Sequence, residues 1–129
     1  MWAYKYGAGS EGIDIHGDDA AVNVNFWITP DEANLDADSG GLIVYPVKAP
    51  GDWNFAAINR HPEQIWNFLK SSAVAPIDVP YRQNRAVIFD SDLFHTTAPM
   101  RFKPGYENRR INVTMLFGRR VGGSRSSAC

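Results

Sequence analysis

Two histidines and one aspartate have the types and the spacing of metal ligands. His16 and Asp18 are separated by a single residue, within a segment in which apolar and polar residues alternate. If this segment is a strand, the two side chains share a face and lie about 7 Å apart along the chain, close enough to converge on one ion. His95 is the best third partner, because a turn at residues 90–92 leads the chain into a neighbouring strand. Two histidines and one carboxylate form a facial triad, which leaves coordination positions open for other ligands.

The histidines have to be weighed against ordinary structural roles. A histidine taken alone is more often a hydrogen-bonded structural residue than a ligand. His61 fits that description, because it precedes Pro62 at an expected helix start and has no partner at ligand spacing. We interpret His61 as a cap or surface residue. The presence of Asp18 beside His16 favours a ligand role for His16 and His95.

Two further segments carry polar residues on the face opposite their apolar face. Along residues 21–29 and 110–117, polar side chains alternate with aliphatic and aromatic ones. Such polar faces in antiparallel sheets commonly contact water, but they can also line a polar cavity beside the metal ligands. The candidates for lining such a cavity are Asn25, Trp27, Thr97, Arg110 and Asn112. Alternation turns Arg109 toward the apolar side, so Arg110 is favoured over it.

The elements that must position these residues are mostly short strands. Alternation and turn residues predict strands over residues 13–18, 21–29, 42–45, 85–89, 93–97 and 110–117. We expect Pro46 to end the third strand and the fourth strand to be buried. One short helix is expected to begin at His61-Pro62, and residues 46–60 have the composition of a loop. Several short strands with one helix indicate an all-β sandwich or jelly roll.

Length and composition limit the kind of protein. The 129 residues suit a single domain, 1–129, with a flexible tail from about residue 119 that includes 122–127. The apolar fraction of 44% is ordinary for a soluble protein, and no apolar run is long enough to cross a bilayer. A formal net charge of -1 makes nucleic acid a disfavoured partner. The single cysteine, Cys129, and the lack of a signal peptide lead us to expect a cytoplasmic location without disulfides.

Several motifs occur in an order that resembles a known group of enzymes. The first is Tyr6-Gly7-Ala8-Gly9 followed by His16-Gly17-Asp18, which is similar to a Y-x-x-G…H-x-D signature. The later motifs are Phe26-Trp27-Ile28-Thr29, Ser39-Gly40-Gly41-Leu42, Asn84 to Ser91 with Phe94-His95, and Arg110 to Thr114. In this ordered combination, which covers residues 4–117, the chain resembles the prolyl-hydroxylase-like members of the Fe(II)/2-oxoglutarate-dependent oxygenase superfamily.

The resemblance implies a fold, a cofactor and a reaction. The implied fold is an all-β double-stranded β-helix, that is, a cupin-like jelly roll. Fe(II) would be held by His16, Asp18 and His95, and the cosubstrate 2-oxoglutarate by Arg110 and Tyr6. A guanidinium fork suits the distal carboxylate of that cosubstrate and stays charged when it is partly buried. We expect hydroxylation of an amino acid, peptide or small metabolite, with release of succinate and CO2.

The chain also departs from the family pattern. Helices that usually precede the first motif and cover the larger sheet are missing, so we expect a homodimer, or else a truncated reading frame. The loop between His95 and Arg110 is longer than in the shortest members. Leu116 stands where nucleic-acid demethylases of the superfamily carry an arginine, so a repair role is a minor alternative. Halogenating relatives replace the carboxylate that Asp18 supplies. A non-catalytic cupin-like binding or structural module is the alternative from another class.

Overall fold

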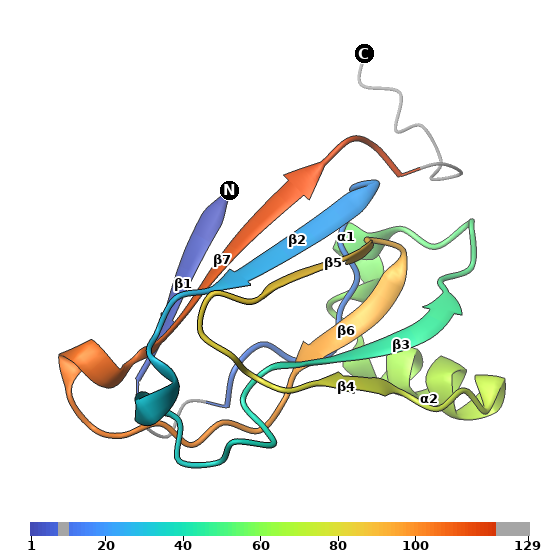
Figure 1. Ribbon diagram of the computed structural model, residues 1–129. Coiled ribbons are helices and arrows are strands. Elements are labelled where there is room, and N and C mark those ends of the chain that lie inside the picture. Colours follow the sequence, from blue (N-terminus) through green and yellow to red (C-terminus); the bar gives the residue numbers. More distant parts are fainter. Residues whose placement is uncertain (8–10, 121–129) are drawn as a thin grey trace.

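Two antiparallel β-sheets form most of the computed structural model, which describes residues 1–7 and 11–120 (Figure 1). The four-stranded sheet has the order β1-β7-β2-β5, and the three-stranded sheet has the order β4-β3-β6. The strands are β1 (Trp2–Tyr6), β2 (Val22–Trp27), β3 (Leu42–Lys48), β4 (Ile77–Val79), β5 (Ala86–Asp90), β6 (Leu93–Thr97) and β7 (Arg110–Phe117). All strand pairs are antiparallel, so the expected all-β class is confirmed.

Alternation in the sequence located β2, β5, β6 and β7 to within two residues at each end. Two expectations about strands were wrong. β3 continues past Pro46 to Lys48, because the register with β6 shifts between Val44 and Lys48 and Pro46 therefore interrupts no regular ladder. β5 is not buried but forms an edge of the four-stranded sheet, where Ile88 is 68% exposed.

The N-terminal strand β1 was not predicted. It pairs with β7 along its whole length, from Trp2 opposite Thr114 to Tyr6 opposite Arg110. The signal was present but short, since three aromatic residues alternate with Ala3 and Lys5. Through this pairing β1 adds a row of aromatic side chains beside the polar residues of β7.

The polar faces of β2 and β7 point between the sheets, and their apolar faces point outward. The buried polar residues of the two strands are Asn23, Asn25, Arg110 and Asn112. Val22 and Phe117, which lie opposite one another on the outer face, are exposed. The polar residues on these strands therefore line the interior, and the interpretation in which they contact water is wrong.

Two α-helices lie beside the three-stranded sheet (Figure 1). α2 (Pro62–Ser72) begins as predicted, with proline in its first turn. His61 occupies the N-cap position without a side-chain capping bond; its exposed ring lies 3.3 Å from Glu63, as expected for a surface residue. α1 (Phe55–Ile58) lies in a segment that was expected to be a loop. The Asn54 side chain accepts the N–H of Ala57 and caps this single turn, which is too short to show helical periodicity.

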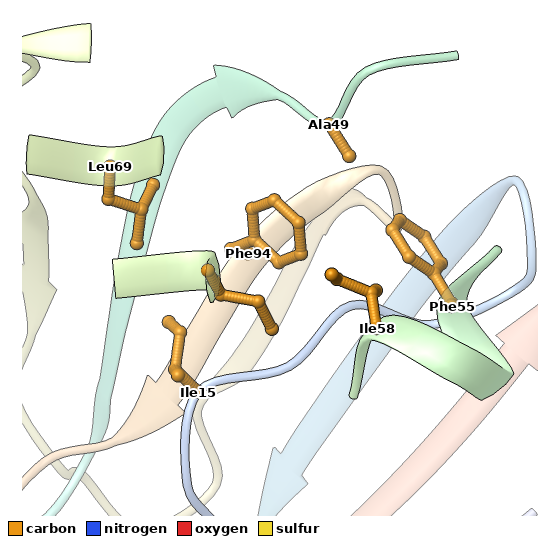
Figure 2. Close-up of a cluster of buried hydrophobic side chains, with 7 residues drawn as sticks. Ile15, Ala49, Phe55, Ile58, Leu69 and Phe94 are labelled. Atoms are coloured by element: carbon orange, nitrogen blue, oxygen red, sulfur yellow. The ribbon is translucent and has the colours of Figure 1, made fainter. Parts of the chain in front are cut away.

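Two hydrophobic clusters hold these layers together. The first joins the helices to the outer side of the three-stranded sheet and contains Ile15, Ala49, Phe55, Ile58, Ile65, Leu69 and Phe94 (Figure 2). The second joins the two sheets and contains Trp27, Ala33, Leu42, Val44, Tyr81 and Phe102. The clusters therefore use opposite faces of the three-stranded sheet.

Two short 3-10 helices, η1 (Asp31–Ala33) and η2 (Tyr106–Asn108), lie in the loops after β2 and before β7. Neither α-helix has the length and apolar character that a membrane-spanning helix needs. Of the tail expected from about residue 119, Arg120 is held by hydrogen bonds to Asp92 and to backbone carbonyls. Residues 122–127, like Ala8 and Gly9 of the first motif, lie outside the described residues.

Candidate metal centre

The segment that carries His16 and Asp18 is not a regular strand, contrary to the prediction for residues 13–18. It pairs with β6 at two points. Thr97 donates its N–H to the carbonyl of Ile13 at 3.1 Å, and His16 and His95 exchange two backbone hydrogen bonds of 3.1 and 3.0 Å. Between these two points the first segment advances by three residues, from Ile13 to His16, whereas β6 advances by two, from His95 to Thr97. Such an extra residue in one strand is a β-bulge. Because of the extra residue, Ile13 and His16 face the same cavity.

Asp14 explains why the ladder is interrupted here. Its carboxylate accepts the N–H of Ile15 at 2.7 Å, and its carbonyl accepts a hydrogen bond from Nδ1 of His16 at 2.7 Å. Local bonds of this kind compete with strand pairing. As a result Asp14 is exposed, and Ile15 points away from the cavity into the first hydrophobic cluster (Figure 2).

The second histidine lies in a regular strand. On β6, Phe94 points into the first hydrophobic cluster (Figure 2). Its neighbour His95 lines the cavity on the other side of the strand. His95 is only 3% exposed, and the ring of Phe89 contacts it edge to face with centroids 4.9 Å apart. A buried apolar residue thus precedes each candidate metal ligand, Ile15 before His16 and Phe94 before His95.

Gly17, which lies between the candidate ligands His16 and Asp18, is held by Asn59 at the end of α1. The N–H of Gly17 donates to Oδ1 of Asn59 at 3.0 Å, and Nδ2 of Asn59 donates back to the Gly17 carbonyl at 2.8 Å. A Cβ at position 17 would lie 2.8 Å from the ring of Phe55. The spacing between His16 and Asp18 is therefore held by a helix that sequence reasoning missed.

The side chains of His16, Asp18 and His95 converge on one point. Nε2 of His95 lies 3.3 Å from Oδ2 of Asp18, and Nε2 of His16 lies 4.0 Å from Oδ1. One ligand atom from each residue lies within 4.8 Å of the other two. An ion bound ~2.1 Å from each atom requires separations of no more than about 4 Å, so small rotations suffice. The three residues form a group that can hold a metal ion.

Hydrogen bonds prepare both imidazoles for metal binding. Nδ1 of His16 is bonded to the carbonyl of Asp14, and Nδ1 of His95 is bonded to the carbonyl of Leu93 at 3.1 Å. A carbonyl oxygen only accepts hydrogen bonds, so Nδ1 of each ring carries a hydrogen, and loss of the Nε2 hydrogen would leave a lone pair that faces Asp18. Burial and the nearby His95 lower the pKa of His16, which favours the neutral form that a metal needs.

Asp18 is held in its charged form. Burial by itself would raise the pKa of this carboxyl group, but hydrogen bonding and charge from His95 and His16 and a hydrogen bond from Asn23 outweigh it. The net pKa is below its ordinary value, so the carboxylate is ionised at neutral pH. Asn23 itself is fully buried and donates to Oδ2 at 2.6 Å. Its place in the alternation of β2 could have marked it as a residue of the site.

Arg110 is a buried cation at the start of β7. Its side chain donates to the carbonyls of Gly40 (2.6 Å, from Nε) and Gly41 (3.4 Å, from Nη2). Nη1 is buried and has no hydrogen-bond partner among the described residues. Burial lowers the pKa of the guanidinium to about 10, so it remains protonated at neutral pH. Arg109, in contrast, is exposed, so Arg110 rather than Arg109 faces the interior, as alternation predicted.

One cavity of about 150 Å³ connects the triad with Arg110. The predicted site residues on its wall are Tyr6, His16, Asp18, Asn25, His95, Thr97, Arg110 and Asn112. The hydroxyl of Tyr6 and Oδ1 of Asn112 are buried without a partner in the described part of the chain. Burial raises the pKa of Tyr6 against the opposing charge of Arg110, so the hydroxyl keeps its proton and can donate.

Trp27 is the predicted site residue that does not line this cavity. It is fully buried in the second cluster, where its ring stacks on Tyr81 with centroids 5.3 Å apart. Sequence reasoning missed the aromatic wall supplied by Trp2 and Tyr4, together with Leu116 of β7. Recognition of β1 as a strand would have placed both aromatic residues in register with Tyr6.

The arrangement as a whole offers three converging metal ligands, a protonated guanidinium and unpaired polar atoms in one cavity. No protein-family model matches the sequence, and no curated protein or solved structure matches it. The functional interpretation therefore rests on the residues and their geometry.

Proposed function

We propose that this protein is an Fe(II)- and 2-oxoglutarate-dependent oxygenase of the hydroxylase type. The observation that carries the proposal is the presence of a metal-binding triad and an unpaired buried guanidinium nitrogen on the wall of one cavity. A triad alone serves many functions. A buried cation with a free N–H in the same cavity additionally calls for an anionic ligand, because an unsatisfied buried charge is costly.

The ligand set supports Fe(II) as the metal. Two histidines and one carboxylate, with other positions open, are the facial triad of non-haem Fe(II) oxygenases. Structural zinc sites instead enclose the ion with four protein ligands. Within residues 1–7 and 11–120, the group contains His16, Asp18 and His95 and no fourth His, Cys, Asp or Glu.

The polar atoms on the wall support 2-oxoglutarate as the cosubstrate. Nη1 of Arg110 and the hydroxyl of Tyr6 are two unpaired donors, and Cζ of Arg110 lies 5.3 Å from the centroid of the Tyr6 ring. A carboxylate accepts from both kinds of donor. A short dicarboxylate can bind there at one end and leave its keto acid end for the metal.

The strand order supports a jelly roll. The segment around His16 pairs with β6 on the side opposite β3, although only His16 forms a regular bridge. If this segment is counted as the missing strand, the chain has two facing sheets of four strands each, the number found in a double-sheet jelly roll. The bulge at Asp14 explains why the strand is not regular.

In this proposal the protein's side chains bind and orient the reactants. The metal supplies dioxygen activation, and 2-oxoglutarate supplies electrons as it becomes succinate and CO2. His16, Asp18 and His95 would hold the metal, and three protein ligands would leave coordination positions free for other ligands. Arg110 and Tyr6 orient the cosubstrate, and the aromatic side chains of β1 restrict the access of water. An amino acid, a peptide or a small metabolite would be the hydroxylated substrate.

Succinate release tests the proposal. We expect purified protein with Fe(II), O2 and 2-oxoglutarate to form succinate slowly without added substrate, by uncoupled turnover. His95→Ala should reduce this rate to that of free Fe(II), whereas His61→Ala, which removes an exposed histidine, should retain it. If the folded wild-type protein forms no more succinate than Fe(II) alone, the oxygenase proposal is wrong, and a non-catalytic binding module becomes the better interpretation.

A further inference from the structure

A chain of hydrogen bonds connects the cavity wall to the carboxylate of the triad. Nδ2 of Asn112 donates to Oγ1 of Thr114 at 2.9 Å, and this hydroxyl donates to Oδ1 of Asn25 at 3.3 Å. Nδ2 of Asn25 donates to Oδ1 of Asn23 at 2.6 Å, and Nδ2 of Asn23 donates to Oδ2 of Asp18 at 2.6 Å. The chain crosses between β7 and β2 where Thr114 lies opposite Asn25.

The charge on Asp18 sets the direction of every bond in this chain. An ionised carboxylate only accepts hydrogen bonds, so Asn23 must present its N–H groups to Asp18 and its oxygen to Asn25. The same constraint then orients the amide of Asn25. Thr114 has a single hydroxyl hydrogen, and it gives this hydrogen to Asn25. Oδ1 of Asn112 remains at the end as a buried acceptor without a partner among the described residues.

Asn23 is the member of the chain that contacts a candidate ligand. It is fully buried, and its neighbours across the strands are Phe89 and Leu116. An amide in such surroundings is costly unless its polar atoms are bonded, and both Oδ1 and Nδ2 are bonded within the chain. Asn23 therefore has few other arrangements available to it.

We propose that Asn23 is a positioning residue of the metal centre, because it holds Oδ2 of Asp18 and so fixes the rotation of the carboxylate toward the two imidazoles. The inference rests on the proposed function, since it assumes that a metal occupies the triad. The four-stranded sheet supplies none of the three ligands, but through Asn23 it would orient one of them. Partners of metal ligands typically change metal affinity by 10–100-fold.

Co(II) binding to the purified metal-free protein is the test, because the visible absorption of Co(II) reports its coordination geometry. Asn23→Leu keeps a side chain of similar size and removes both hydrogen bonds. We expect its affinity for Co(II) to fall about tenfold or more, and its absorption bands to shift from those of the wild type. In Asn23→Ser the side chain is too short for its hydroxyl to reach Asp18, so this variant should show the same two changes. It replaces the leucine variant in the test if Asn23→Leu does not fold.

Thr29→Val is the matched control. Thr29 follows β2, is buried on the same inward face, donates to the carbonyl of Arg109 at 2.6 Å and accepts the N–H of Ile111 at 2.9 Å. The substitution removes buried hydrogen bonds that have no link to Asp18. We expect it to lower the urea midpoint of unfolding and to leave Co(II) affinity and absorption unchanged.

The outcomes separate the positioning role from the proposed function. A folded Asn23 variant with wild-type Co(II) affinity and absorption overturns the role of Asn23. Equal losses of Co(II) affinity in the Thr29 control also overturn it, because they would reflect general destabilisation. A wild-type protein that binds Co(II) but forms no succinate contradicts the oxygenase proposal, while the Asn23 comparison still stands. A wild-type protein that does not bind Co(II) overturns both.

Discussion

Arg110 carries the strongest functional signal of any single residue. It is 1% exposed, and no carboxylate in the described residues forms an ion pair with it. The lowering of its pKa from 12.5 to about 10 corresponds to roughly 3 kcal/mol against the charged form. Below pH 10 the guanidinium is nevertheless protonated, so the folded protein carries this cost until an anion binds. A bound carboxylate would recover part of that free energy.

Arg110→Met should abolish stabilisation by 2-oxoglutarate. In the wild-type protein with Mn(II) under anaerobic conditions, 2-oxoglutarate at ~100 times its Kd should raise the Tm by roughly 5–10 °C, since ligand binding stabilises by about 2.7 kcal/mol at that excess. Differential scanning fluorimetry should show no such rise in Arg110→Met, although Mn(II) alone should still stabilise the variant.

Arg109→Met provides the control for this prediction, because Arg109 is the exposed neighbour with the same charge. It should respond to 2-oxoglutarate as the wild type does. An undiminished response of Arg110→Met would show that the cosubstrate binds elsewhere.

At the scale of elements, the short helix α1 contributes more to the site than its length suggests. Phe55 closes the space beside Gly17, and Asn59 bonds both backbone polar groups of that glycine. The triad therefore depends on three supports: the β6 strand, the bulged segment and the end of α1. The segment that contains α1 has loop composition in the sequence, whereas residues 13–18 alternate like a regular strand, and the positions of both depend on tertiary contacts.

Asn59→Ala should weaken metal binding. The substitution removes two hydrogen bonds to Gly17, which should cost roughly 1–2 kcal/mol and let the His16 and Asp18 side chains move apart. Isothermal titration with Mn(II) should show reduced affinity, and urea unfolding should give the stability change. Asn54→Ala at the other end of α1 removes a helix cap and should cost about 1 kcal/mol without a loss of affinity. Unchanged Mn(II) affinity in folded Asn59→Ala would contradict the positioning role of α1.

The elements that were predictable from sequence are those with a long, regular pattern. β7 alternates over its eight residues, and both its bounds and the grouping of its polar residues on one face followed from that pattern. The inward direction of that face did not follow from it, because polar faces of antiparallel sheets commonly contact water. The bulge at Asp14 was not predictable, because a one-residue offset leaves the sequence alternation intact while it reverses which side chains face the cavity. Trp27 shows the same limit, since it has the inward register but packs into the second cluster rather than on the cavity wall.

At the scale of the whole molecule, the outer face of the four-stranded sheet stands out. No helix among residues 1–7 and 11–120 covers it, whereas both α-helices lie beside the other sheet (Figure 1). Val22, Phe117 and Ile88 belong to this face, and each is exposed. Contiguous apolar faces of this kind usually mark a contact surface. We propose that a second copy of the chain packs on this face to form a homodimer.

Sedimentation equilibrium tests the dimer. The wild-type chain should sediment as a dimer at micromolar concentration, because pairing would remove the exposed apolar side chains of this face from water. Ile88→Lys places a charge in the proposed interface and should give a monomer that retains Mn(II) affinity. The control Ile77→Lys alters an exposed isoleucine of β4, on the other sheet, and should remain dimeric. A monomeric wild-type protein over the same concentration range would rule the dimer out.

The central claim is that three side chains from two distant segments bind one Fe(II) together with 2-oxoglutarate anchored on Arg110. Visible absorption under strictly anaerobic conditions measures this directly, because a metal-to-ligand charge-transfer band appears only when the keto acid chelates protein-bound Fe(II). We predict a weak band in the wild type after both additions, and its loss in His95→Ala and Arg110→Met. A folded wild-type protein that binds Fe(II) but shows no band at saturating 2-oxoglutarate would contradict the account.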